Sequence, residues 1–116
     1  MNQLKLNLTD GSVTFGFTAS AARDLQGAIG ELMQSLKAVA AAKPASGGRV
    51  TPQPPMEYRY AGDVFLEIFC NPNIYASPFA AKVLITLRDD RIRVSTEAEL
   101  TRVIEDLNLY LEQVEG

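Results

Sequence analysis

The amino-acid sequence predicts an α+β fold in which two helices pack on one face of a mostly antiparallel sheet. A hairpin pattern followed by a helix pattern occurs near each end of the chain, and a further pair of strand patterns lies between them. The expected element order is therefore ββα–linker–ββ–ββα. The 116 residues fit a single domain, 1–116, because a chain of this length rarely buries two separate cores.

The first hairpin is predicted from the alternation of apolar and polar residues on both sides of an Asp-Gly pair at 10–11. If these two residues form the loop, Leu8 faces Val13 and Leu6 faces Phe15. Because side chains in a strand alternate between two faces, the apolar residues then share one face of the ribbon. These residues are Leu4, Leu6, Leu8, Val13, Phe15 and Phe17.

A helix is expected next, with Thr18 or Ser20 as the N-cap that accepts a backbone N–H bond. Apolar residues then recur three and four positions apart, which places them on one helical face. They are Leu25, Ile29, Leu32 and Leu36, with Met33 at the margin. The alanine-rich run at 38–42 extends the helix, and Lys43-Pro44 is expected to end it.

The composition changes at residues 44–55, which contain four prolines and two glycines. Such a segment is typical of a flexible linker or a long exposed loop. A Pro-rich ligand for an aromatic groove on another protein is the functional alternative.

A further strand pair is predicted at 58–70, with a turn at 61–63. Its second strand, 64–70, is almost continuously apolar, which is typical of a strand covered on both faces. Glu67 conflicts with this interpretation, because a carboxylate in a covered strand must find a partner or reach solvent.

Residues 71–80 are expected to form a loop, because they contain an Asn-Pro and a Ser-Pro pair. The loop is unusually apolar for a connection, since it carries Ile74, Tyr75 and Phe79. Two interpretations stay open: these side chains fold back over the core, or they form a recognition loop.

The second hairpin is predicted from about residue 81, with Leu87 opposite Ile92 and Ile85 opposite Val94 on either side of a turn with two aspartates. The helices should cover the apolar face of both hairpins. That face carries Leu6, Leu8, Phe15, Ile85, Leu87, Ile92 and Val94.

The final helix is expected to start at a capping box formed by Thr96 and Glu99. Its buried stripe is Leu100, Val103, Ile104, Leu107, Leu111 and Val114. The two ββα units match at an offset of 79 residues in the hairpins and 75 in the helices. A true pseudo-repeat and a chance likeness of two apolar patterns both stay open.

The composition argues against catalysis and metal binding. The chain has no histidine and one cysteine, Cys70, so it lacks the ligands of a structural zinc site and the base of a Ser-His-Asp arrangement. The place of Cys70 at the end of an apolar strand favours a packed thiol over a nucleophile. Asp89 and Asp90 form a carboxylate pair at the expected hairpin tip, where solvated turn residues explain them better than acid–base catalysis. We therefore expect no enzymatic activity, no cofactor and no metal.

Charge and sorting signals point to a soluble protein of the cytoplasm. The net charge of −3 disfavours generic binding to nucleic-acid phosphates. A single cysteine cannot form an internal disulfide, which fits a reducing compartment. The first residues lack the apolar run of a signal peptide, and no stretch approaches the roughly 20 apolar residues of a membrane span.

Three surfaces are candidates for contact with a partner: an exposed leucine in an acidic field, a basic hairpin and an apolar loop. Their residues are Leu109, Glu105 and Glu112 on the final helix, Arg91 and Arg93 on the second hairpin, and Ile74, Tyr75 and Phe79 in the loop. A lone exposed leucine and ordinary solubilising charge are the structural alternatives.

The preferred function is a non-enzymatic protein-interaction module, regulatory or assembly-related, that binds a protein partner or self-associates through a sheet edge or the final helix. The alternative is a nucleic-acid-binding domain that uses the open sheet face. Its basic residues would be Arg91, Arg93, Lys5 and Lys82. The third hypothesis is a small-ligand or enzymatic site under the loop at 71–80.

The segments STEAEL (95–100) and EDLNLYL (105–111) resemble the ends of small uncharacterised proteins of photosynthetic bacteria, the cyanobacteria. They cover less than a fifth of the chain and contain no functional motif. The resemblance implies a cytoplasmic setting and assigns no site residues.

Overall fold

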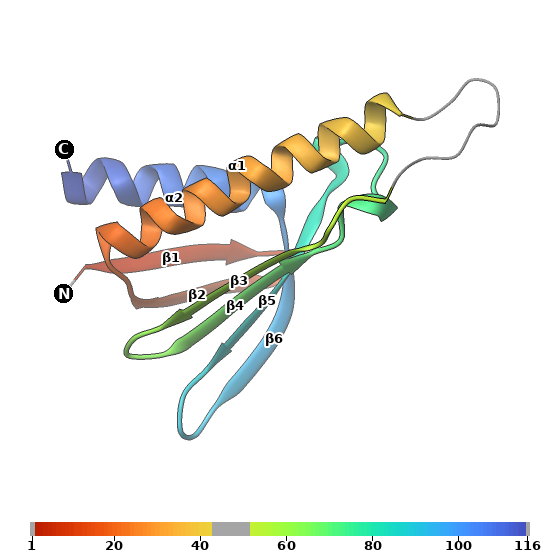
Figure 1. Cartoon of the computed structure of the whole chain (residues 1–116). Coiled ribbons are helices and arrows are strands. Elements are labelled where there is room, and N and C mark those ends of the chain that lie inside the picture. Colours follow the sequence, from red (N-terminus) through yellow and green to blue (C-terminus); the bar gives the residue numbers. More distant parts are fainter. Residues whose placement is uncertain (1, 43–51, 116) are drawn as a thin grey trace.

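A computed structural model describes residues 2–42 and 52–115 and has an α+β architecture (Figure 1). The predicted element order is confirmed. The elements are β1 (Gln3–Leu8), β2 (Gly11–Gly16), α1 (Ala19–Ala41), β3 (Met56–Ala61), β4 (Phe65–Cys70), β5 (Lys82–Arg88), β6 (Arg93–Glu99) and α2 (Leu100–Glu115), with the short 3-10 helices η1 (Pro72–Ile74) and η2 (Pro78–Ala80) between β4 and β5.

The two helices lie side by side above the strands (Figure 1). The strands form two antiparallel sheets rather than one, with the orders β1-β2 and β3-β4-β5-β6. The small hairpin packs under α2, where the Asp106 carboxylate accepts hydrogen bonds from the Asn7 backbone N–H (2.7 Å) and side-chain amide (2.9 Å). It meets the larger sheet where the Thr9 N–H donates to the Glu97 carbonyl at 3.2 Å.

The predicted register of the first hairpin is wrong by two residues. Leu8 faces Gly11 and Leu6 faces Val13, so the loop is Thr9-Asp10. Gly11 is the first residue of β2 and not part of the loop. Its φ of 129° is a conformation that residues other than glycine rarely adopt. A shift of two residues keeps each side chain on its predicted face.

The register of the second hairpin is also shifted. Leu87 faces Val94, and a four-residue loop separates β5 from β6. The Asp89 carboxylate closes this loop, because it accepts from the N–H groups of Arg91 and Ile92 at 2.8 Å each. Ile92 therefore lies in an exposed loop rather than on the covered face, and Val94 is exposed as well.

The predicted capping box does not form. Thr96 lies in β6 opposite Ile85, and the strand continues to Glu99 because the Leu100 N–H still donates to the Ala81 carbonyl of the neighbouring chain segment (3.0 Å). The buried face of α2 is consequently rotated from the predicted stripe. It consists of Leu100, Val103, Asp106, Leu107 and Tyr110, with Ile104, Leu111 and Val114 partly buried.

Helix α1 follows the prediction closely. The Thr18 Oγ1 accepts from the Ala21 N–H at 3.0 Å, so the helix begins at Ala19. The predicted apolar residues are buried on one face and Met33 is partly buried. On the exposed side, the Arg23 Nε donates to the Glu115 carboxylate (2.8 Å) and links the two helices.

Phe17, just before α1, connects β3 and α2 in the core. Its ring makes edge-on contacts with Tyr60 and Tyr110, at centroid distances of 4.7 and 6.0 Å, and the Tyr110 hydroxyl donates to the Phe17 carbonyl. The Tyr58 hydroxyl donates to the Ala21 carbonyl of α1 at 3.1 Å. These bonds tie the large sheet and α2 to the start of α1.

Most of the predicted linker, 44–51, lies outside the described residues. The remaining part, 52–55, is held by Asn73 of η1, whose side chain accepts from the Gln53 N–H (2.8 Å) and donates to the Gln53 carbonyl (2.9 Å). These last linker residues are therefore anchored to the body of the protein.

Candidate functional site

The two helices lie against one face of the four-stranded sheet and leave the opposite face open to solvent; we call this the outer face. Side chains of β4 alternate between the two faces. Leu66 and Ile68 are buried on the helix side, whereas Phe65 and Phe69 are 43% and 40% exposed. The prediction that this strand is covered on both faces is wrong, and Glu67 reaches solvent on the outer face.

The strand registers arrange the outer face in three rows that cross all four strands. The first row is Glu57–Phe69–Leu84–Glu97, the middle row is Arg59–Glu67–Thr86–Ser95, and the third row is Ala61–Phe65–Arg88–Arg93. Each row therefore starts on the edge strand β3 and ends on the edge strand β6, while its centre lies on β4 and β5.

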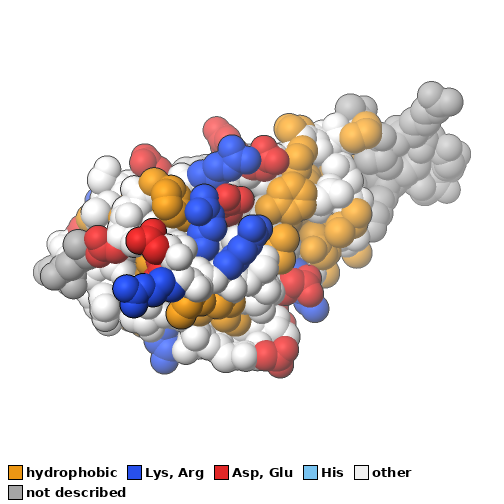
Figure 2. All heavy atoms as spheres, turned by 90° about the horizontal axis from the view of Figure 1, so that it is seen from below, with side chains coloured by type: hydrophobic (Ala, Val, Ile, Leu, Met, Phe, Trp, Pro, Cys, Tyr) orange, Lys and Arg blue, Asp and Glu red, His pale blue; other side chains and the backbone are white. Residues whose placement is uncertain are grey.

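Three exposed apolar side chains lie on the two central strands of the outer face, in the rows on either side of the polar middle row. Phe69 faces Leu84, which is 43% exposed, and Phe65 lies four residues along the same strand. Figure 2 views the molecule from this side and shows hydrophobic side chains gathered toward one end, with Lys and Arg side chains beside them. Exposed apolar side chains that cluster in this way are typical of a contact surface.

Charged side chains lie between and beside these apolar residues. The guanidinium carbon of Arg88 lies 4.3 Å from the centroid of the Phe65 ring, in cation–π geometry. A hollow of about 420 Å³ opens beside this pair, next to Arg59 and Glu67. In the middle row, the hydroxyl oxygens of Thr86 and Ser95 are hydrogen-bonded at 2.9 Å.

The charge of the outer face is balanced. Counting Lys82 opposite Glu99 at the end of the sheet, it carries four basic and four acidic side chains. They are Arg59, Lys82, Arg88 and Arg93, and Glu57, Glu67, Glu97 and Glu99. A sheet that binds nucleic acid needs a contiguous basic face. The described strands present a face of mixed charge instead.

The residues predicted as interaction sites lie in separate places. Leu109 is 54% exposed on α2, between the exposed residues Glu105 and Glu112, and Arg102 lies 3.6 Å from the Glu105 carboxylate. Arg93 belongs to the third row of the outer face, whereas Arg91 lies in the loop at the hairpin tip.

The loop at 71–80 was predicted either to fold back over the core or to form a recognition loop, and its apolar side chains do not all behave alike. Tyr75 packs against the core, and burial of the phenol raises its pKa above the usual value. Ile74 and Phe79 are 68% and 85% exposed. The segment therefore folds back through one aromatic side chain and presents two apolar side chains to solvent.

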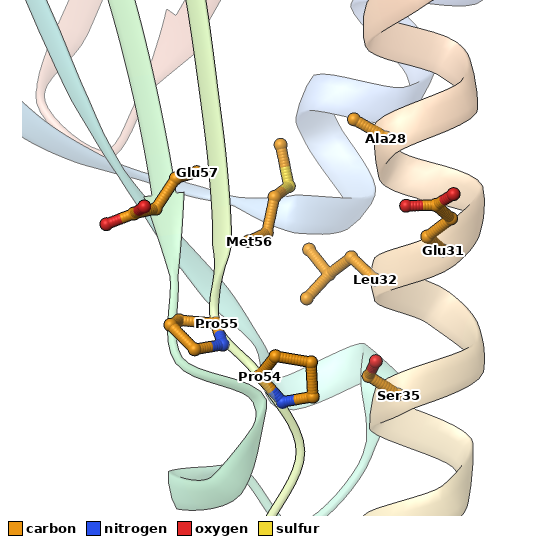
Figure 3. A pocket seen from close by; sticks show the side chains of 8 residues that line it. All are labelled: Ala28, Glu31, Leu32, Ser35, Pro54, Pro55, Met56 and Glu57. Carbon is orange, nitrogen blue, oxygen red and sulfur yellow. The ribbon is translucent and has the colours of Figure 1, made fainter.

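The cavity between α1 and the start of β3 is small and is lined by both apolar and polar residues. It measures about 220 Å³, and the Leu32 and Met56 side chains extend into the space between helix and strand while Pro54 and Pro55 line one end (Figure 3). The Glu57 carboxylate points away from it. The other polar side chains of its lining, Glu31 and Ser35, both come from α1.

The outer-face residues Phe65, Phe69 and Leu84 were not predicted as a site. Both β4 and β5 carry apolar residues on each face, so the sequence shows a continuous run in which the exposed positions do not stand out. The signal that could have identified the face is Glu67, because a carboxylate that needs solvent marks Phe65 and Phe69, two positions away on either side, as outward-facing.

Cys70 is buried, and burial raises the pKa of its thiol to about 11. The thiol is therefore protonated near neutral pH, which fits packing rather than nucleophilic attack. Across 2–42 and 52–115 there is no group of three or more His, Cys, Asp or Glu residues that could hold a metal ion. None of the helices in these ranges is long and apolar enough to cross a membrane.

Comparison of the chain with models of protein families, with curated proteins and with solved structures gives no match. The resemblance to proteins of photosynthetic bacteria and the pseudo-repeat of the ββα units therefore stay predictions.

Proposed function

We propose that this chain is a non-enzymatic protein-interaction module, regulatory or assembly-related, that binds a protein through the outer face of its four-stranded sheet. One observation supports this above all: Phe65, Phe69 and Leu84 stand 40–43% exposed on the two central strands of a face that also carries charged side chains. Exposed aromatic side chains interspersed with polar ones are a common feature of protein interfaces, in which aromatic residues are enriched.

The charge of the face favours a protein over a nucleic acid. Binding to the phosphate backbone depends on an excess of Lys and Arg, and each acidic side chain on the face opposes it. Two exposed phenylalanines could stack on unpaired bases, but Glu57 and Glu97 lie in the row of Phe69, and Glu67 stands between the two rings on β4. A protein surface that also carries both signs of charge can pair with all of these groups.

The test compares three immobilised forms of the chain: the wild type, Phe69→Ser and Leu109→Asp. The leucine variant is the matched control, because it changes an exposed apolar residue on α2, away from the outer face. Each form is offered labelled wild-type chain, then a cell lysate, then a fluorescent single-stranded oligonucleotide. Thermal melting monitored by circular dichroism verifies that both variants are folded.

We expect a protein that is retained by the wild type and by Leu109→Asp and is lost with Phe69→Ser. Equal retention by all three forms would contradict the proposal. Retention of the oligonucleotide that depends on Phe69 would also contradict it and would favour the nucleic-acid alternative.

A further inference from the structure

We infer that the occupant of the outer face is a second copy of this chain, bound face to face about a twofold axis that runs across the strands along the middle row. This inference rests on the proposed function and names its partner. It is carried by the distribution of charge over the three rows, which is self-complementary in one twofold arrangement and not in the other.

Two twofold arrangements can stack one outer face on another, because the axis between the sheets can run across the strands or along them. An axis across the strands places each strand over its own counterpart and exchanges the first row with the third. An axis along the strands places each row over itself and exchanges β3 with β6 and β4 with β5.

The axis across the strands brings opposite charges together. Glu97 of the first row lies over Arg93 of the other copy, and this contact occurs twice by symmetry. Phe69 lies over Phe65 of the other copy, beside the hollow of about 420 Å³ that adjoins that ring. Leu84 falls on the aliphatic stem of Arg88.

The twofold axis runs along the middle row, and the charged residues of this row can pair across it. Arg59 and Glu67 face each other on neighbouring strands of one sheet. Each meets its own counterpart across the axis, so Arg59 of one copy lies diagonally next to Glu67 of the other, about one strand spacing (roughly 4.8 Å) to the side. Long side chains can form both of these crossed pairs between sheets packed about 10 Å apart.

The axis along the strands is unfavourable. It places Glu57 over Glu97 of the other copy, twice, so that the ends of the first row repel each other. Each arrangement leaves one charge over Ala61, Arg93 for the axis along the strands and Glu57 for the axis across them, so this contact does not discriminate between the two. The charge distribution therefore selects the axis across the strands.

The size of the face sets the expected strength of the dimer. Four strands about 4.8 Å apart and six residues long at about 3.3 Å each span an area on the order of 400 Å² per copy in projection. The two copies together would then bury on the order of 800 Å², which is below the roughly 1,200–2,000 Å² of stable specific interfaces and in the range of weak, transient ones. We therefore expect a weak, reversible dimer and not a permanent one.

Charge reversal tests the arrangement, with sedimentation velocity over a concentration series as the measurement. Glu97→Arg places Arg over Arg93, and Arg93→Glu places Glu over Glu97, so each variant should weaken its own dimer by at least about tenfold. An equimolar mixture of the two variants should associate again, because both contacts of the mixed dimer are then oppositely charged. The double variant Glu97→Arg/Arg93→Glu should dimerise like the wild type.

The inference is overturned if the mixture and the double variant stay as monomeric as the single variants. It is also overturned if Glu97→Arg strengthens the dimer, which is the result expected when Glu57 lies opposite. A wild-type chain that is monomeric at all concentrations but binds another protein through Phe69 would refute self-association and leave the proposed function standing. A chain without either property would refute both.

Discussion

At the scale of single residues, Asp106 is the polar group on which the packing of the small hairpin depends. Its carboxylate is 7% exposed and accepts two hydrogen bonds from Asn7, while Arg102 Nε lies 3.7 Å away. A buried carboxylate is stable only when its oxygens have partners, and here β1 supplies them to α2.

Replacing Asp106 should therefore destabilise the fold. Asp106→Ala leaves the Asn7 backbone N–H without its acceptor, which should lower the free energy of unfolding by about 1–3 kcal/mol. Urea denaturation at neutral pH measures this change. Glu105→Ala is the matched control, because that side chain is exposed and its loss should change stability by less than about 0.5 kcal/mol. Equal effects of the two substitutions would contradict the role given to Asp106.

Stability should fall at alkaline pH because of Cys70 and Tyr58. Burial raises the pKa of Cys70 from 9.0 to about 11, and burial followed by the charge of Asp24 raises the pKa of Tyr58 from 10.0 to about 12. When the pH exceeds the pKa that a group has in the unfolded chain, the unfolded chain binds fewer protons than the folded one. The free energy of unfolding therefore decreases as the pH rises.

Urea denaturation midpoints should accordingly be constant to about pH 8 and fall between about pH 9 and pH 12. The Cys70→Ala variant should lose the first part of this fall, which begins near the unfolded thiol pKa of 9.0. A flat profile up to pH 12 would show that neither group is held in its neutral form by the fold.

At the scale of elements, the turn between β3 and β4 depends on the close approach of Tyr60 to Gly62. A Cβ added at Gly62 would lie 2.6 Å from Cζ of the Tyr60 ring, and that ring packs on Phe17 in the core. By contrast, Gly30 of α1 has nothing within 4 Å of the added atom.

The two glycines should therefore respond in opposite ways to substitution by alanine. Gly62→Ala should lower the free energy of unfolding by about 1–3 kcal/mol, because the Tyr60 ring must move. Gly30→Ala should raise it by about 0.5–1 kcal/mol, because alanine is the better helix residue. Thermal and urea unfolding of the two variants measure both changes, and a stabilised Gly62→Ala would refute the tight contact.

Helices and strands could be predicted from the sequence where the apolar residues follow a single periodicity. The buried face of α1 follows from its spacing of three and four residues, and Thr18 was among the expected caps. The start of α2 could not be predicted, because the local Thr96–Glu99 pattern is overridden by a tertiary hydrogen bond from Leu100 to Ala81. Both hairpin registers depended on which residue adopts an unusual conformation or closes the loop, and the apolar alternation does not encode this choice.

At the scale of the whole molecule, both helices cover one side of the large sheet, and this arrangement creates the outer face (Figures 1 and 2). The sequence predicted that helices lie on one side but not which side chains would be left exposed. Phe65 and Phe69 were hidden in an apolar run, whereas Leu109 stood out because acidic residues lie on the same side of its helix. Local pattern thus finds isolated exposed residues more easily than a face assembled from four strands.

The outer face should be the place where association is lost on mutation. Phe69 contributes little to the core because 40% of it is exposed, so Phe69→Ser should keep the fold while removing one of the exposed apolar side chains of the interface. Truncation of an aromatic hot-spot residue costs about 2 kcal/mol or more of binding free energy, which is roughly a thirtyfold loss of affinity.

The most direct measurement is sedimentation velocity of the wild type, Phe69→Ser and Leu109→Asp over the same concentration series. The sedimentation coefficient of the wild type and of Leu109→Asp should rise with concentration toward that of a dimer, while Phe69→Ser stays monomeric. An identical concentration dependence for the wild type and Phe69→Ser would contradict the claim that this chain associates through the outer face of its sheet.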